Sequence, residues 1–148
     1  MPISEKAIIT NMCMIENEDG QILVQNRNSE DWPGVTLPGG KVEKSESFVD
    51  SVVREVFEET GLTIHNPQIC GTKQFQTDQD ERYIVLMYRA NQFSETLRSS
   101  DEGEVFWINK NELNNFELAN DFEEMFRVMD SDSLSEFYYD DSWNIHLK

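Results

Sequence analysis

Cysteine is scarce in this chain, and long apolar runs are missing. Cys13 and Cys70 are the only cysteines in 148 residues. The N-terminal stretch MPISEKAIIT has no basic segment followed by an apolar one, so no secretory signal is visible. No apolar run approaches the ~20 residues that a membrane-spanning helix needs. We therefore expect free thiols, a cytoplasmic location and no contact with a membrane.

Basic residues are also few. The chain has 12 Lys and Arg against 29 Asp and Glu, which gives a formal net charge of −17. Because phosphate backbones are bound by clustered Lys and Arg, this balance excludes a nucleic-acid-binding protein. An acidic protein that handles an anionic substrate needs an element that inverts its charge, and a bound divalent cation supplies one. The acid excess also keeps a protein soluble.

The length and composition are those of one folded domain. A hydrophobic content of 38% and an aromatic content of 11% argue against disorder. No repeat, low-complexity tract or linker interrupts the chain, so we expect a single domain over residues 1–148 that buries a real core. Its oligomeric state is left open between a monomer and a homodimer.

Strand and helix patterns mix without strict alternation, which predicts an α+β or mixed α/β fold. Apolar and β-branched residues predict strands at 7–15, 21–25, 63–75, 82–90 and 105–108. The turn-forming Asn17, Asp19 and Gly20 predict that the first two strands form a hairpin. Helical spacing predicts a helix at 121–129. The aromatic and acidic stretch 137–147 is left unassigned.

The most informative segment runs from Gly40 to Leu62 and reads GKVEKSESFVDSVVREVFEETGL. An amphipathic helix is expected from about Ser47 to Thr60. Its apolar stripe, expected to bury against a sheet, consists of Phe48, Val49, Val52, Val53, Val56 and Phe57. Glu55, Glu58 and Glu59 gather on another side, at positions i, i+3 and i+4. Three carboxylates that close repel one another, and hard cations such as Mg²⁺ or Mn²⁺ would remove the repulsion.

Glycines frame this segment. Gly61 stands where a helix end favours a left-handed residue, and Gly39 and Gly40 allow a sharp turn that exposes backbone carbonyls near the acids. A Glu-rich helix face alone is usually solvated, and Arg54 could simply pair with a neighbouring acid on the surface. The fixed spacing of the glycines and Glu46 favours a metal site instead.

The segment resembles the signature of the Nudix hydrolases, G-x(5)-E-x(7)-R-E-U-x-E-E-x-G-U, where U is a bulky aliphatic residue. Its specified positions are filled by Gly40, Glu46, Arg54, Glu55, Val56, Glu58, Glu59, Gly61 and Leu62. The resemblance implies an α/β/α sandwich with a mixed central sheet. It also implies an enzyme that cleaves a nucleoside diphosphate linked to another group, by metal-assisted attack of water on phosphorus.

The resemblance also implies roles for individual residues. Metal ligands are expected at Glu55, Glu58, Glu59 and the carbonyl of Gly39, joined by Glu102 from a loop outside the signature. Asp101 and Glu104 are adjacent candidates for that last ligand. Glu46 is expected to pair with Arg54, and Arg54 to orient Glu55. Glu55 is the preferred general base, with Glu102 second.

Further matches resemble the MutT branch, which hydrolyses oxidised purine nucleoside triphosphates such as 8-oxo-dGTP to a monophosphate and pyrophosphate. They are Arg27, the approach Leu-Pro-Gly-Gly-Lys at 37–41, and the F-x-x-A-N pattern at 116–120. In that branch the arginine touches the nucleotide and the asparagine, here Asn120, reads the base. The asparagine is equally suited to cap the last helix. Trp32 and Phe75 could stack on a base or belong to the core.

Other substrates remain as alternatives: ADP-ribose, a dinucleoside polyphosphate or another nucleotide sugar. Members of the family that use ADP-ribose usually carry a proline about fifteen residues after the signature, and this chain has no proline after Pro67. The tyrosine that marks the dinucleoside polyphosphatases is also missing, since residues 77–80 read TDQD. A non-catalytic, nucleotide-sensing module is a remote alternative, because such modules often lose the signature glutamates that this chain keeps.

Overall fold

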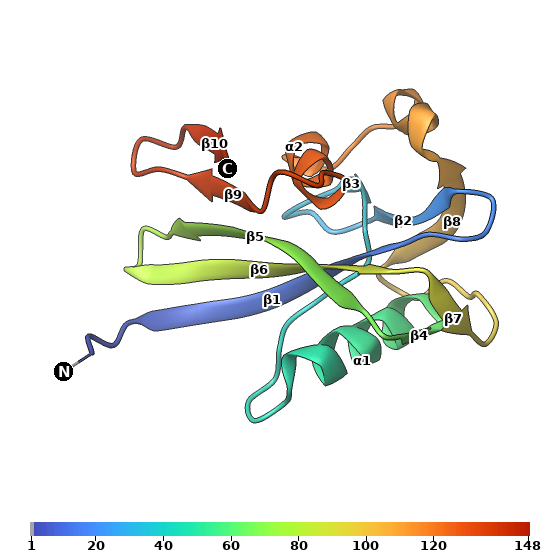
Figure 1. Ribbon diagram of the computed structural model, residues 1–148, viewed down its shortest axis with the longest axis horizontal. Coiled ribbons are helices and arrows are strands. Elements are labelled where there is room, and N and C mark those ends of the chain that lie inside the picture. The colour runs from blue at the N-terminus through green and yellow to red at the C-terminus, as the bar shows by residue number, and fades with distance from the viewer. Residues whose placement is uncertain (1) are drawn as a thin grey trace.

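A computed structural model describes residues 2–148 of the chain (Figure 1). Its elements in chain order are β1 (Lys6–Ile15), β2 (Gln21–Arg27), β3 (Gly34–Thr36), α1 (Phe48–Thr60), β4 (Thr63–His65), β5 (Gln68–Gln76), β6 (Glu81–Ala90), β7 (Gln92–Ser94), β8 (Gly103–Asn109), the 3-10 helix η1 (Lys110–Asn115), α2 (Phe122–Met129), β9 (Glu136–Tyr139) and β10 (Ile145–Leu147). No helix among these residues is both long and apolar enough to cross a bilayer. Both cysteines are free.

The central sheet is mixed, as predicted. Its strand order is β1-β6-β5-β9-β10, in which β1 runs parallel to β6 and β5 runs antiparallel to β6. A second, antiparallel sheet has the order β3-β2-β8. The few helices and the mixed sheet confirm the predicted α+β class with a mixed central sheet.

Two cores lie on opposite faces of the central sheet. Figure 1 shows α1 on one side of β1, β6 and β5, and α2 with β2, β3 and β8 on the other. Val52 and Val56 of α1 are buried against Leu23 of β2 and Leu86 of β6. The other core contains Met12, Met14, Ile22, Val24, Met87, Phe122, Met125 and Phe137. Strands buried on both faces explain why the 82–90 pattern is almost continuously apolar.

Helix α1 begins and ends where its local sequence predicts. The hydroxyl of Ser47 accepts the N–H of Asp50 at 2.9 Å, and Gly61 adopts φ +79° while its N–H donates to the carbonyl of Phe57. The predicted apolar stripe is too broad. Only Val52 and Val56 are fully buried, Val53 is half-buried, and Phe48, Val49 and Phe57 are 46%, 47% and 44% exposed. A helix lying on a sheet buries a narrow arc, so the stripe's edges reach solvent.

Two strand predictions need correction. The chain does turn at residues 17–20, but beyond the single Glu16–Ile22 bridge the first two strands belong to different sheets. Turn residues specify a reversal, whereas pairing is decided by distant strands: β1 pairs with β6 over its whole length. The strand predicted at 63–75 is divided at Asn66, which has φ +51°. Its first part, β4, pairs with β7 instead of joining the central sheet.

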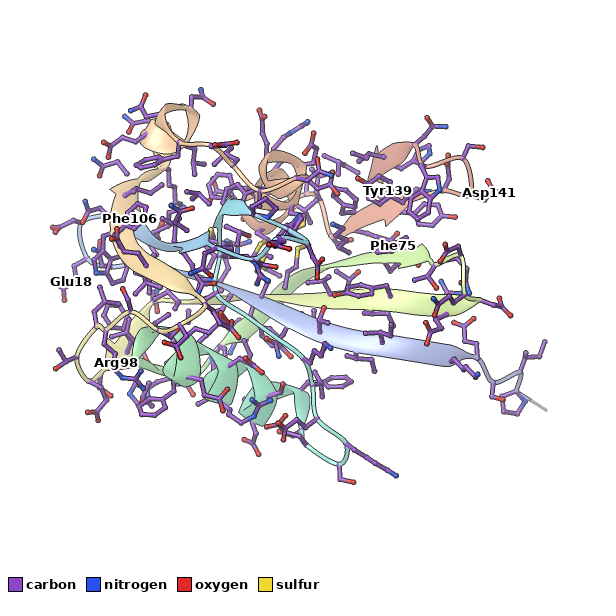
Figure 2. All side chains as sticks on the ribbon, turned by 180° about the vertical axis from the view of Figure 1, so that it is seen from behind. Glu18, Phe75, Arg98, Phe106, Tyr139 and Asp141 are labelled. Carbon is purple, nitrogen blue, oxygen red and sulfur yellow. The ribbon has the colours of Figure 1, made fainter. Side chains whose placement is uncertain are left out.

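The unassigned C-terminal stretch forms a hairpin of β9 and β10 that extends the central sheet beside β5. The carboxylate of Asp140 closes its turn by accepting the N–H groups of Ser142 and Asn144 and by contacting His146 at 2.8 Å. These contacts hold the pKa of Asp140 at about 2. The hairpin places aromatic side chains against β5, and Figure 2 shows Tyr139 beside Phe75, with ring centroids 5.8 Å apart.

Candidate active site

The turn at 38–40 is fastened to β1 and to α1. The N–H of Cys13 donates to the carbonyl of Pro38, and the N–H of Asn11 donates to that of Gly40, at 2.9 and 2.8 Å. The side chain of Asn11 accepts the N–H of Gly40 and donates to the hydroxyl of Ser51, at 3.0 and 2.9 Å. This one amide therefore holds the glycine turn and the signature helix in fixed relation.

Both glycines of the turn are required by close approach. A Cβ on Gly39 would collide with the backbone of Asn11 and Met12. A Cβ on Gly40 would lie within the carboxyl group of Glu55. The pair Gly39-Gly40 thus leaves room for β1 on one side and for a signature glutamate on the other.

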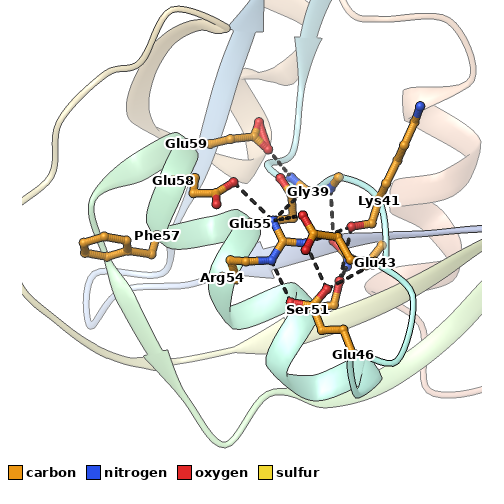
Figure 3. Close-up of polar contacts among 12 residues, drawn as sticks. Gly39, Lys41, Glu43, Glu46, Ser51, Arg54, Glu55, Phe57, Glu58 and Glu59 are labelled. Carbon is orange, nitrogen blue, oxygen red and sulfur yellow. Dashed lines mark hydrogen bonds and ion pairs between the residues drawn. The ribbon is translucent and has the colours of Figure 1, made fainter.

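Arg54 is the centre of an ion-pair network on α1 (Figure 3). It binds Glu46 through two hydrogen bonds, from Nε to Oε2 at 2.6 Å and from Nη2 to Oε1 at 3.0 Å. Nη1 reaches Glu55 Oε1 at 2.9 Å and Glu58 Oε2 at 3.2 Å, and Nη2 also donates to the carbonyl of Lys41. The guanidinium lowers the pKa of Glu46 to about 2, and Glu46 raises the pKa of Arg54. The pairing of Arg54 with Glu46 and its contact with Glu55 are as expected.

Glu59 is the most deeply buried of the signature acids, with 2% of its surface exposed. Its Oε1 accepts the N–H of Gly39 at 3.0 Å, while its Oε2 has no hydrogen-bond partner. Burial, with a smaller contribution from the neighbouring Glu102, raises its pKa to about 8, although the N–H of Gly39 acts in the opposite direction. Burial also raises the pKa of Glu55. Two carboxylates are thus held where negative charge is unfavourable without a nearby cation.

These acids suit a divalent cation. Protein groups bind one oxygen each of Glu55, Glu58 and Glu59, which leaves the second oxygen of each carboxylate available. The Oε2 of Glu59 is buried and has no hydrogen-bond partner, so it is the oxygen best suited to a positive ligand. Within residues 2–148 no three His, Cys, Asp or Glu side chains are already gathered closely enough to hold an ion.

A cavity of about 750 Å³ is lined by Glu55, one of the three signature acids, and by aromatic residues, whereas Glu58, Glu59 and Asn120 are not part of its lining. Its lining includes Gly39, Gly40, Glu55, Glu102, Arg27, Trp32, Phe75, Tyr83 and Lys73. Of the three adjacent candidates for the extra acid, Glu102 is in the lining, and it is also close enough to Glu59 to raise its pKa. The cavity has the size of a small-molecule site, and its lining contains both polar and apolar residues.

Arg27 and Trp32 line this cavity, and Trp32 contacts the main chain of Asn120. Arg27 Nε donates to the carbonyl of Trp32 at 3.2 Å, and its guanidinium lies 5.6 Å from the indole centroid. Trp32 Nε1 donates to the main-chain carbonyl of Asn120 at 3.0 Å. Asn120 is exposed, and the helix cap is Asp121, with φ +70°. The alternative that Asn120 caps α2 is therefore excluded.

Sequence reasoning missed a buried ion pair beside the cavity. Lys73 of β5 is 8% exposed, and its ammonium lies 3.3 Å from Asp121 Oδ2 and 3.4 Å from Met125 Sδ. It also stands 4.9 Å from the ring centroid of Phe137 and 5.7 Å from that of Tyr139. Burial lowers the pKa of Lys73. The sequence did contain a signal for this pair, because Lys73 stands two residues before Phe75 and therefore lies on the same face of β5.

Comparison with known proteins decides the family. The family model described as the NUDIX domain matches residues 7–129. The chain belongs to the Nudix family. A relative in Bacillus subtilis strain 168, the uncharacterized Nudix hydrolase YvcI, is 32% identical over 116 residues, which cover 75% of this chain and 71% of the relative. Another protein of that strain, provisionally named an 8-oxo-dGTP diphosphatase, is 38% identical over 73 residues, which cover 49% and 48% of the two chains.

The Nudix chain also matches solved structures. The mutator MutT protein of Bacillus halodurans superposes with a TM-score of 0.76 and 26% identity, covering 95% of this chain and 97% of that one. The expected Nudix fold is confirmed, and with it a MutT-like resemblance. The protein is a hydrolase of the pyrophosphohydrolase type, and enzymes of this family generally require a divalent cation.

Proposed function

We propose that this Nudix hydrolase is a MutT-like, Mg²⁺- or Mn²⁺-dependent diphosphatase of oxidised purine nucleoside triphosphates, with 8-oxo-dGTP as its substrate. The products are a nucleoside monophosphate and pyrophosphate, and the role is sanitation of the cytoplasmic nucleotide pool. The proposal takes residues 1–148 as one Nudix domain. Two comparisons support the substrate class. One relative bears the provisional name 8-oxo-dGTP diphosphatase, and one similar solved structure is a MutT protein.

One observation carries the proposal: carboxylates suited to a cation and aromatic rings suited to a base line the same cavity. A triphosphate carries its charge at one end and its planar base at the other, so it needs both kinds of lining. Glu55 and Glu102 contribute carboxylates to the lining, and Trp32, Phe75 and Tyr83 contribute aromatic rings. Phe75 and Tyr83 stack with centroids 5.2 Å apart and form one continuous apolar wall.

The proposed ion ligands are Glu55, Glu58, Glu59, Glu102 and the carbonyl of Gly39. A bound divalent cation supplies charge neutralisation at the phosphate oxygens and lowers the pKa of attacking water. Glu55 accepts the proton of that water, and its burial already raises its pKa toward that of a general base. Glu102 is the second candidate for the base.

The remaining residues hold the substrate and the base in place. Arg54, fixed by Glu46, orients Glu55 through the 2.9 Å hydrogen bond from Nη1. Arg27 lines the cavity beside Trp32 and is placed to contact the nucleotide. Asn120, one residue before Asp121 and bonded through its carbonyl to Trp32, offers an amide to the base edge.

The test is pyrophosphate release with Mg²⁺ across 8-oxo-dGTP, dGTP, ADP-ribose and a diadenosine polyphosphate. A strong preference for 8-oxo-dGTP supports the proposal. Preference for ADP-ribose or the dinucleotide overturns the substrate and keeps the hydrolase. Glu58→Gln and Glu59→Gln should each abolish turnover, while Glu123→Gln, an exposed acid on α2, should not change it. Near-normal turnover in the first two variants would show that the metal site is elsewhere.

A further inference from the structure

A buried amide interrupts the apolar face of β2 that packs toward α1. Leu23 and Gln25 point to the same side of β2, because side chains alternate along a strand. Leu23 packs in the core that contains Val52 and Val56 of α1. Gln25 continues this face and has no exposed surface, and Thr36, its direct partner on β3, is 1% exposed. Apolar residues would fit both positions by pattern alone.

The polar atoms of this group lack partners. Within residues 2–148, the buried side-chain nitrogen and oxygen atoms without a hydrogen bond are Gln25 Nε2, Gln25 Oε1, Thr36 Oγ1 and Glu59 Oε2. All four belong to neighbouring residues. Gln25 pairs with Thr36 on β3 and with Val105 on β8. Val105 packs in the core that contains Val56 of α1, and Glu59 lies one helical turn beyond Val56. Gln25 Nε2 and Glu59 Oε2 are not hydrogen-bonded to each other in the structure.

Unpaired buried polar groups destabilise a fold, so Gln25 is not explained by stability. A polar residue at a buried position where the strand pattern favours an apolar one is expected mainly at functional sites. Glu59 already has one oxygen fixed by the N–H of Gly39. A second donor on Oε2 would fix the plane of the carboxylate, and Gln25 Nε2 is the buried, unused donor beside it.

We propose that Gln25 is a positioning residue for the cation site: its Nε2 donates to Glu59 Oε2 when the Glu59 carboxylate binds a divalent cation. This inference rests on the proposed function only in that Glu59 is a cation ligand. Groups that hold a metal-binding carboxylate in place commonly change metal affinity by about 10- to 100-fold when removed. Gln25 would therefore set the affinity of the site without touching the cation or the substrate.

The experiment is a Mn²⁺ titration of the substrate-free protein, followed by electron paramagnetic resonance of the free ion. Gln25→Met keeps the length of the side chain and removes the amide. We expect Mn²⁺ affinity to fall at least about 10-fold. In chelator, the melting temperature should equal or exceed that of the wild type, because two unpaired polar atoms are gone.

Leu23→Met is the matched control, since it alters the same buried face of β2 without a polar change. Unchanged Mn²⁺ affinity in Gln25→Met, or an equal fall in Leu23→Met, would overturn the proposal. A loss of stability in Gln25→Met larger than in Leu23→Met would also overturn the proposal, because it would show that the Gln25 amide stabilises the fold. Glu59→Gln separates the two hypotheses: if it leaves Mn²⁺ affinity intact, the proposed cation site itself has failed.

Discussion

Arg54 and Glu46 are joined by two parallel hydrogen bonds, from Nε at 2.6 Å and from Nη2 at 3.0 Å. Glu46 stands just before the N-terminus of α1, whereas Arg54 lies in the middle of the helix. The two bonds to Glu46 therefore fix the orientation of the guanidinium relative to the other carboxylates. Its Nη1 then reaches Glu55 at 2.9 Å, so the orientation of the proposed base depends on an acid that does not line the cavity.

Arg54→Lys should retain the positive charge and lose this geometry, because an ammonium cannot form the two-pronged pair with Glu46 while bonding Glu55. We expect kcat to fall about 10- to 100-fold with a smaller change in KM. Steady-state kinetics of pyrophosphate release measures both constants. Arg127→Lys, an exposed arginine in the last turn of α2, is the control and should behave as wild type. Equal kcat in Arg54→Lys and wild type would show that charge alone suffices.

Glu59 predicts a pH-dependent stability of the cation-free protein. Its pKa is 4.5 unperturbed and about 8 in the folded state. Between these pH values Glu59 is protonated in the folded state and ionised in the unfolded state. Its protonation therefore contributes to the unfolding free energy fully below pH 4.5, and this contribution is lost as the pH rises through 8. With chelator present, the unfolding free energy of the wild type should fall relative to that of Glu59→Gln as the pH rises from 4.5 to 8. The slope should be at most about 1.4 kcal/mol per pH unit.

Urea unfolding of both proteins at several values of pH measures this difference. Saturating Mg²⁺ should abolish it, because a cation replaces the proton on Glu59 and binds only the folded state. Parallel pH profiles for the wild type and Glu59→Gln in chelator would contradict the prediction.

Gly40→Ala should damage activity more than stability. The new Cβ would occupy the position of the Glu55 carboxyl, a side-chain end that can move aside. We expect a fall in kcat of at least about 100-fold, as for a misplaced catalytic group, with a small change in melting temperature. Gly20→Ala provides the opposite case: its φ is +77° and no atom lies near the added Cβ. That variant should lose about 1 kcal/mol of stability and keep its activity.

Lys73 and Asp121 should show strong energetic coupling. Lys73→Met leaves the carboxylate of Asp121, whose side chain is 12% exposed, without its cation. Breaking a buried pair from one side costs about 3 kcal/mol or more. Adding Asp121→Asn should recover most of that loss, which a double-mutant cycle in urea measures. Additive losses would show that the two groups contribute independently.

Asn120→Ala should reduce discrimination between 8-oxo-dGTP and dGTP. The side chain is exposed and Asp121, not Asn120, caps α2, so the helix should be unaffected. Removing a hydrogen bond to a base edge commonly costs about 1–3 kcal/mol of discrimination. The measurement is the ratio of kcat/KM for the two nucleotides. An equal loss on both would remove Asn120 from base recognition.

The elements that the sequence predicts well are those with local causes. Ser47 and Gly61 bound α1 through contacts within one turn, and the spacing of Glu55, Glu58 and Glu59 alone puts them on one side of the helix. The pairing of Glu46 with Arg54 follows from the same short segment. The hairpin prediction is wrong because a turn does not specify which strands pair.

The family, the signature helix and the acids on that helix can all be read from the sequence, because each depends on residues within 23 positions of one another. The surroundings of those acids depend on the packing of distant elements. Gln25 is buried near Glu59 because Leu23 of β2 and Val105 of β8 share a core with α1. Lys73 lies 3.3 Å from Asp121, 48 positions away, because α2 packs on β5. Such neighbours are selected by burial and strand register, which no local pattern encodes.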